Sequence, residues 1–110
     1  MPARIFVLLG AVCLLASGCG DFHARNAKRT PPGVNAAHGK TLFSIQCAAC
    51  HGAEGRGGPV GPVLRNERSR RSVRAIRDAI EFPSPPMPKL YPAQITRRDL
   101  EDVAAYVNQL

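Results

Sequence analysis

Cys47-Ala48-Ala49-Cys50-His51 is the most informative stretch of this 110-residue chain. Two cysteines with two residues between them, followed at once by histidine, form the pattern of a c-type haem attachment site. On a helical turn, residues at i, i+3 and i+4 share one face, so both thiols and the imidazole can point at one flat ligand. The thiols would form thioether bonds to haem, and His51 would bind the iron. The motif therefore predicts one haem c, covalently attached through Cys47 and Cys50.

Closely spaced cysteines also occur in dithiol redox pairs, in halves of zinc sites and in structural disulfides. A zinc site needs two further ligands, and the sequence has no second cysteine pair and no His-x-His cluster. A thioredoxin-like pair is found in a βαβ setting, which the flanking residues do not offer. The chain has no tryptophan and few aromatic residues, so a porphyrin would add apolar bulk to a small core. These observations favour haem.

The start of the chain has the pattern of an export signal. Arg4 precedes an apolar run of twelve residues, 5–16, which is too short to span a bilayer. Leu15-Ala16-Ser17-Gly18-Cys19 resembles a bacterial lipobox, in which Cys19 would carry the lipid. Ordinary signal cleavage is the alternative, and it would leave a soluble periplasmic protein. We therefore predict a lipoprotein-type signal peptide over residues 1–18 and a mature chain held in the cell envelope by a membrane anchor at Cys19.

Two regions follow the signal. Residues 19–33 are polar and contain Pro31-Pro32, which predicts a flexible tether. Residues 34–110 are predicted to form the folded domain. Asn35 is a plausible N-cap for a first helix that runs toward the cysteine motif. Gly39 falls on the apolar stripe of that helix, where the lack of a side chain would let another helix cross closely.

Residues 52–62, directly after the motif, predict a loop. Glycine or proline occupies seven of the eleven positions, a density that neither helix nor strand tolerates. Next to a haem, this loop would form a backbone collar around the cofactor. A ligating imidazole also needs an acceptor for its second nitrogen, commonly a backbone carbonyl. We predict that Pro62 supplies that carbonyl to His51.

A second helix is predicted from Ser69 or Ser72 to Ile80. Apolar side chains recur on one face at helical spacing, at Val73, Ile76 and Ile80. The opposite face is charged. It offers two possible i,i+4 ion pairs, Arg74–Asp78 and Arg77–Glu81.

The last helix is predicted to begin at Thr96, with Asp99 three residues later in the manner of a capping box. Its apolar face comprises Leu100, Val103, Ala104 and Val107. No stretch of the chain alternates apolar and polar residues as a strand would. The predicted fold is therefore all-α.

Met87 is the candidate for the second ligand of the iron. It is the only methionine beyond the signal segment, and it lies among five prolines in residues 83–92. Prolines restrict the loop before anything binds, which suits holding one side chain rigidly. Two alternatives are a methionine that fills a core gap and a bis-histidine site that uses His23 or His38. Met87 remains the favoured partner of His51.

Four segments together resemble one family: 39–43 leading into 47–52, Gly61-Pro62-Val63-Leu64, Met87-Pro88, and 99–107. In this order they are similar to small class I cytochromes c of the bacterial envelope. The resemblance implies a compact fold of three to four helices around one covalently attached haem. It also implies that the first and last helices cross near a glycine and aromatic residues. Those positions map to Gly39, Phe43 and Tyr106.

The predicted function is one-electron transfer between redox partners in the cell envelope, without bond chemistry on a substrate. A methionine opposite histidine raises the potential of the iron, which suits a carrier that feeds an acceptor. One alternative is a gas-binding or sensing domain in which Met87 dissociates from iron. Another is the dedicated electron-transfer subunit of a periplasmic dehydrogenase or reductase.

Charge predicts the kind of partner. The chain has fifteen Lys and Arg residues against eight Asp and Glu, a formal net charge of +7, and six arginines lie between Arg65 and Arg77. Such a patch would steer an acidic redox protein toward the molecule, or would lie near anionic lipid. Export makes nucleic acid an improbable partner despite the positive charge. We expect a monomer.

Overall fold

The protein is described here by a computed structural model that covers residues 31–110. The predicted signal peptide, Cys19, His23 and most of the predicted tether lie outside the described residues. The elements in chain order are α1 (Ala36–Gln46), α2 (Ala48–His51), two 3-10 turns, η1 (Ala53–Gly55) and η2 (Glu67–Ser69), α3 (Val73–Glu81) and α4 (Arg97–Val107). No strand occurs between residues 31 and 110, so the all-α prediction is confirmed.

Helix α1 begins as predicted and leads directly into the cysteine motif. The Asn35 side chain caps it by accepting from the backbone N–H groups of Ala37 and His38, at 3.0 and 3.1 Å. These bonds satisfy two of the donors that a helix start leaves without a partner. Helix α1 ends at Gln46 and α2 starts at Ala48, so Cys47 is the junction between them. The motif therefore consists of this junction residue and the single turn that follows it.

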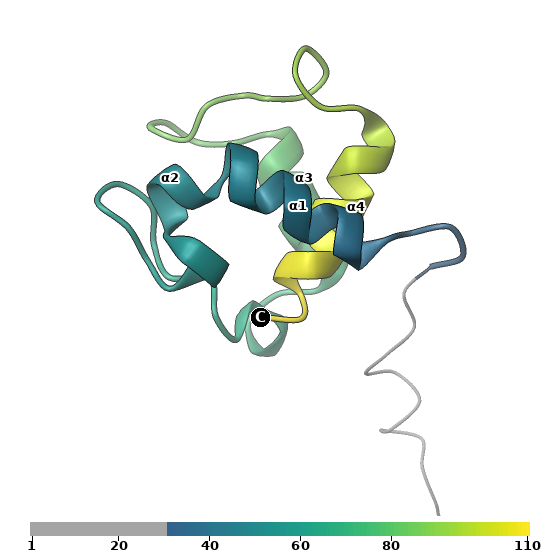
Figure 1. Ribbon diagram of the computed structural model, residues 1–110, viewed down its shortest axis with the longest axis horizontal. Helices are drawn as coiled ribbons and strands as arrows, with labels where there is room; N and C mark the ends of the chain where they lie inside the picture. Colours follow the sequence, from purple (N-terminus) through teal and green to yellow (C-terminus); the bar gives the residue numbers. More distant parts are fainter. Residues whose placement is uncertain (1–30) are drawn as a thin grey trace, which may run out of the picture.

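The crossing of α1 over α4 forms the centre of the core, as Figure 1 shows. A Cβ built on Gly39 would collide with the backbone carbonyl of Asp102, so glycine is what permits the close approach. Next to this crossing the Phe43 and Tyr106 rings meet edge to face, with centroids 5.4 Å apart. Both aromatic side chains are buried. The crossing implied by the resemblance is present at these three positions.

Helix α4 carries its predicted cap and its predicted buried face. The Thr96 hydroxyl accepts from the Asp99 N–H, and the Asp99 carboxylate accepts from the Thr96 N–H at 2.8 Å, which completes a capping box. One polar residue is buried with the apolar ones. Asp102 is 1% exposed and accepts from the Asn35 N–H at 2.7 Å and from His38 Nδ1 at 2.9 Å. This carboxylate ties the start of α1 to α4.

Helix α3 buries the predicted side, but its predicted ion pairs were wrong. Instead, Arg77 contacts its neighbour Asp78 at 2.5 Å and Glu101 of α4 at 3.4 Å. Glu81 is buried and pairs with Arg97 of α4 at 3.0 Å. Because α3 packs on α4, charged groups of α4 lie within reach of Arg77 and Glu81. They replace the partners one turn away on α3. Tertiary contact overrides the local i,i+4 pattern here.

The chain between α3 and α4 is an irregular segment that covers one side of the molecule (Figure 1). Leu90 and Ile95 from this segment are buried in the core cluster, and Met87 packs against that cluster. The segment is thereby fixed at several points along its length. Its position matters for the site, because it lies across from α2.

A cavity between the cysteine motif and the methionine loop

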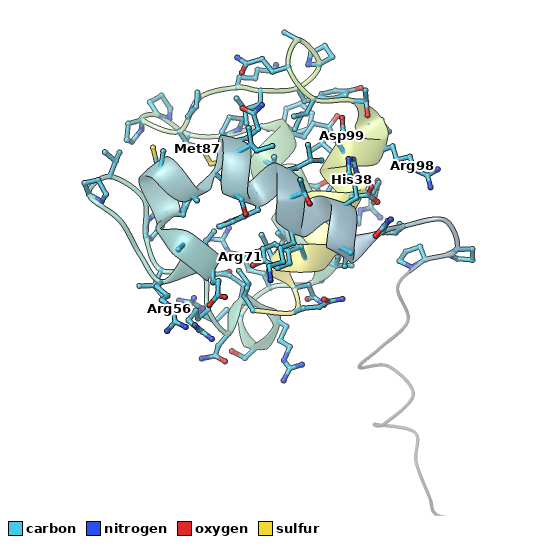
Figure 2. The ribbon with its side chains drawn as sticks, in the orientation of Figure 1. His38, Arg56, Arg71, Met87, Arg98 and Asp99 are labelled. Atoms are coloured by element: carbon cyan, nitrogen blue, oxygen red, sulfur yellow. The ribbon has the colours of Figure 1, made fainter. Side chains whose placement is uncertain are left out.

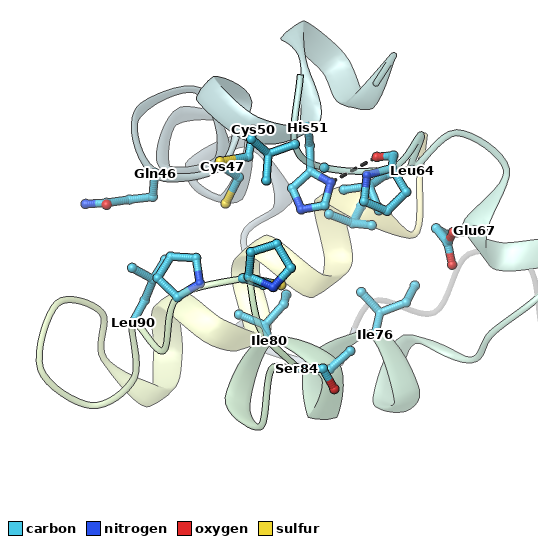
Figure 3. A pocket seen from close by; sticks show the side chains of 18 of the residues that line it. Gln46, Cys47, Cys50, His51, Leu64, Glu67, Ile76, Ile80, Ser84 and Leu90 are labelled. Carbon is cyan, nitrogen blue, oxygen red and sulfur yellow. Dashed lines mark hydrogen bonds between the residues drawn. The ribbon is translucent and has the colours of Figure 1, made fainter. Parts of the chain in front are cut away.

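Cys47, at the junction of α1 and α2, and Cys50 of α2 line one cavity. Cys47 and Cys50 are half-buried, are not joined in a disulfide, and line the same wall (Figure 3). Burial, with a smaller effect of the neighbouring Cys50 thiol, raises the pKa of Cys47 to about 11. Redox-active Cys-x-x-Cys pairs instead have a lowered thiol pKa. The environment of Cys47 therefore argues against a dithiol redox pair.

His51 is buried at the end of the same turn, and its ring is held by the following loop. Its Nδ1 lies 3.0 Å from the carbonyl oxygen of Pro62, the contact drawn as a dashed line in Figure 3. Because a carbonyl can only accept, Nδ1 carries the proton and donates it. The other nitrogen, Nε2, keeps its lone pair and points into the cavity in Figure 3. A metal-binding histidine has this arrangement.

The glycine-rich loop approaches the motif too closely for side chains. A Cβ on Gly61 would lie 2.7 Å from His51 Nδ1 and 2.8 Å from the Cys50 carbonyl oxygen. The Gly61 N–H donates to that same carbonyl at 2.8 Å, and the Gly57 N–H donates to the His51 carbonyl at 2.7 Å. These backbone bonds fix the loop against α2. Residues 52–62 therefore form the backbone collar that their glycine and proline content predicts.

The cavity has a volume of about 410 Å³. Figure 3 shows His51 on one side and the segment that carries Ser84 and Leu90 on the other. Met87 belongs to that segment and also lines the cavity. Apolar side chains complete the wall, and they include Leu64, Ile76, Ile80 and Val107. The fold thus brings together all five residues predicted for the cofactor site: Cys47, Cys50, His51, Pro62 and Met87.

The residues present fit a covalently attached haem. The volume lies in the range of cofactor pockets, and the wall is mainly apolar, as a porphyrin requires. Two thiols, a nitrogen with a free lone pair and a thioether sulfur are the groups that haem c uses. No group of three or more His, Cys, Asp or Glu side chains that could hold a metal ion occurs within residues 31–110. A zinc site is therefore not formed in this part of the chain.

One further candidate, His38, falls outside the cavity. His38 is exposed, hydrogen-bonds to Asp102 and is not among the lining residues. A bis-histidine site that uses His38 is therefore wrong. The predicted lipid attachment residue Cys19 lies outside the described residues. Between Pro31 and Leu110, none of the helices combines the length and the apolar character that crossing a membrane requires.

One part of the cavity wall, its charged end, was not predicted from the sequence. Glu67 and Arg71 both line the cavity, and Glu67 is buried. In the sequence, Arg71 is one of six clustered arginines and Glu67 an isolated acid among them. Hydrophobic periodicity cannot identify a buried charged residue. Only the fold places the η2 turn at the edge of the cavity.

Comparison with known proteins agrees with this geometry. The family described as cytochrome C oxidase, cbb3-type, subunit III matches residues 34–107. That range contains the cysteine motif, the loop with Pro62, Met87 and α4. Searches of curated proteins and of solved structures gave no match. The chain therefore belongs to the family of cytochrome c oxidase, cbb3-type, subunit III, and is a small c-type cytochrome with an all-α, cytochrome c-like fold.

Proposed function

We propose that this protein is a monohaem electron carrier, in which Cys47 and Cys50 would hold haem c and His51 and Met87 would bind its iron. Bound haem supplies an iron that takes up and releases a single electron. The chain's own residues bind the cofactor, orient the ligating imidazole and exclude water from it. The Pro62 carbonyl keeps the proton on Nδ1 of His51 and leaves Nε2 for the iron.

One observation carries the proposal. A single cavity has the Cys-x-x-Cys-His turn on one side and the Met87 segment on the other. If His51 and Met87 both bound the iron, it would have no open position for a substrate. The one carboxylate on the wall, Glu67, is already paired with Arg70 at 2.6 Å. The residues that line the cavity thus favour a carrier over an enzyme.

The proposals on partner and location rest on charge and on the sequence of residues 1–19. Six arginines lie between Arg65 and Arg77, in and around η2 and α3, and suit an acidic redox protein as donor or acceptor. Arg68 and Arg74 have no ion-pair partner within residues 31–110 and are exposed. We further propose that Cys19 anchors the mature protein to a membrane of the cell envelope.

A second candidate function is favoured by the family match. The matched description names a subunit of an oxidase, which would make this chain the electron-entry subunit of a larger complex. The dedicated-subunit alternative and the free carrier use the same haem site. They differ in whether a catalytic partner stays bound. Co-purification of the chain with a haem-containing oxidase from detergent-solubilised membranes would favour the subunit.

The test is a combined mass and redox measurement on the full chain, purified from an exporting bacterial host. The intact mass should show one covalent haem, and a Cys47→Ser/Cys50→Ser variant should lack it. A redox titration should follow a single one-electron step. The reduced protein should not bind carbon monoxide at neutral pH, since Met87 occupies the sixth position. Absence of haem in the wild type, or carbon monoxide binding by it, would refute the proposed carrier.

A further inference from the structure

The segment that carries Met87 has no backbone hydrogen bond to its neighbours. Residues 83–95, the Met87 segment, connect α3 to α4 (Figure 1). Between residues 31 and 110, every backbone hydrogen bond of this segment joins two of its own residues. Leu90 and Ile95 are buried in the core, and both come after Met87 in the chain. Side-chain contacts therefore decide how firmly the segment is held over the cavity.

An ion pair joins the two helix ends between which this segment runs. Glu81 is the last residue of α3, and Arg97 is the first residue of α4. Arg97 Nη2 donates to Glu81 Oε1 at 3.0 Å, with the carboxylate buried and the Arg97 side chain 54% exposed. Breaking a pair that includes a buried charge is costly, because the remaining charge is left without a partner. The pair therefore fixes the distance between the two ends of the Met87 segment.

The same guanidinium also binds the middle of the segment. Its central carbon lies 5.2 Å from the centroid of the Tyr91 ring, a cation–π contact, and Nη2 lies 3.4 Å from the Tyr91 hydroxyl oxygen. Within the described part of the chain, this is the one hydrogen bond between the Met87 segment and residues outside it. Neither Tyr91 nor the Glu81–Arg97 pair lines the cavity. Arg97 thus holds the segment from outside the site where haem would bind.

We propose that Arg97 is a positioning residue that keeps Met87 within reach of the haem iron. It does so by holding Glu81 and Tyr91 together, which keeps the Met87 segment closed over the cavity. The inference rests on the haem attachment and the Met87 ligation proposed above. A thioether on a loosened segment would spend more time away from the iron, so an added ligand would compete with it more effectively. Arginine suits this role, because its flat guanidinium can stack on an aromatic ring while it pairs with a carboxylate.

The experiment adds imidazole to the oxidised, haem-loaded full chain and measures its affinity from absorption spectra. Imidazole binds the iron only in molecules in which Met87 has left it, so its apparent affinity reports the fraction of molecules with an open segment. Arg97→Gln removes the ion pair and the cation–π contact. It should therefore raise the imidazole affinity about fivefold.

The matched control is Arg98→Gln, at the next residue of α4. Arg98 is exposed and hydrogen-bonds to the Gly33 carbonyl, and in Figure 2 it points outward, well apart from Met87. Both substitutions remove a positive charge from the first turn of α4, so they change the electrostatics of the helix start alike. The imidazole affinity of Arg98→Gln should equal that of the wild type. An unchanged affinity in Arg97→Gln, or an equal rise in Arg98→Gln, would overturn the proposal.

Amide hydrogen exchange of the same variants separates positioning from a general loss of stability. Arg97→Gln should speed exchange in residues 83–95 and leave α1 at the wild-type rate. An equal acceleration in α1 would show a general destabilisation and would overturn the positioning role. If Arg97→Gln does not accumulate because Glu81 is left unpaired, Glu81→Gln/Arg97→Gln decides, since it removes both charges. It should show the same rise in imidazole affinity, and a wild-type affinity would refute the proposal.

These outcomes are distinct from those that test the carrier function. A wild type without covalent haem by intact mass, or one that binds carbon monoxide when reduced, would contradict the carrier. Hydrogen exchange in residues 83–95 does not require iron ligation. An unchanged exchange rate there in Arg97→Gln would therefore count against the role of Arg97 alone.

Discussion

His51 Nδ1 lies 3.0 Å from the carbonyl oxygen of Pro62, so the loop that follows the cysteine motif holds the imidazole of that motif. The contact joins residues eleven positions apart, and backbone hydrogen bonds from Gly57 and Gly61 to α2 maintain it. No side chain other than the imidazole takes part. The arrangement is therefore sensitive to the space around the glycines rather than to the chemistry of a neighbouring side chain.

Gly61→Ala should disturb this arrangement. The new methyl group would meet His51 Nδ1 and the Cys50 carbonyl, and neither can move without shifting α2. We expect the free energy of unfolding to fall by about 1–3 kcal/mol, as for other overpacked sites. Haem should stay attached, because both cysteines remain. Denaturant unfolding of the haem-loaded protein measures the loss. Val63→Ala, at a half-exposed position of the same loop, is the control and should change little.

Met87→Ala tests the proposed axial ligand. The covalent haem should remain, but the sixth position of the iron should open. The reduction potential should then fall well below that of the wild type, because the thioether favours ferrous iron. The reduced variant should also bind carbon monoxide. Redox titration and absorption spectra measure both effects. Lys89→Ala, two residues further along, should resemble the wild type. A Met87→Ala potential equal to that of the wild type would rule Met87 out as a ligand.

Gly39→Ala tests the helix crossing. In an isolated helix, alanine is more stable than glycine by about 1 kcal/mol. Here its methyl group would collide with the Asp102 backbone of α4. We therefore expect the opposite sign, a loss of about 1–3 kcal/mol in unfolding free energy. Ser44→Ala, on the exposed side of the same helix, should stay within about 0.5 kcal/mol of the wild type. A more stable Gly39→Ala protein would show that the two helices can separate slightly at no cost.

Asp99 should make stability depend on pH. Hydrogen bonds from the Thr96 N–H and the Thr96 hydroxyl, with a smaller effect of His38, hold the pKa of Asp99 below its ordinary value. A depressed carboxyl pKa contributes stability above the unfolded-state value of about 3.9, and that stability is lost as pH falls through the folded-state value. Asp99→Ala should therefore cost about 1 kcal/mol at neutral pH. Wild type and variant should converge in acid, as followed by thermal unfolding at several pH values. A stability difference between wild type and Asp99→Ala that stays constant across these pH values would contradict a contribution from Asp99 ionisation.

Charge reversal tests the proposed acidic partner. Arg68→Glu/Arg74→Glu changes two exposed residues of η2 and α3 that have no ion pair within the described chain. We expect oxidation by an acidic redox protein to slow several-fold at low salt and to lose most of its salt dependence. Stopped-flow oxidation at several ionic strengths measures this. Lys40→Glu/Arg98→Glu, with the same charge change on α1 and α4, should slow oxidation less. An uncharged small oxidant should react equally with all variants. If the acidic protein oxidised the wild type and Arg68→Glu/Arg74→Glu at equal rates, the proposed docking face would be refuted.

Much of the local structure was predictable from the sequence because its causes are local. The caps of α1, α3 and α4 depend on a side chain and N–H groups two or three residues away, so Asn35 and Thr96 could be identified directly and Ser72 was one of two candidates. The cysteine motif likewise needs only one helical turn to align its side chains. The apolar face of α4 follows from helical periodicity, and its buried residues agree with that face.

The ion pairs of α3 and the charged end of the cavity were not predictable in this way. Arg77 has an acid one turn away in sequence but contacts Glu101 of another helix. Glu67 is buried because the η2 turn packs at the cavity edge, and no pattern of neighbouring residues indicates this. Both outcomes depend on distances between separate elements. Those distances are set by packing and not by spacing along the chain.

The amino-acid sequence alone therefore predicted a c-type cytochrome, the all-α class and five residues that line one cavity. Each of these depends on residue type and short-range spacing. The tertiary structure decided that Met87 shares one cavity with His51, which lies far from it in the chain, and that Glu67 lies at the end of that cavity away from the cysteines (Figure 3). Closing that cavity requires α1 to cross α4 at Gly39 and the segment after α3 to pack through Leu90 and Ile95. Such long-range packing brings separate segments together and so gives the cavity its shape.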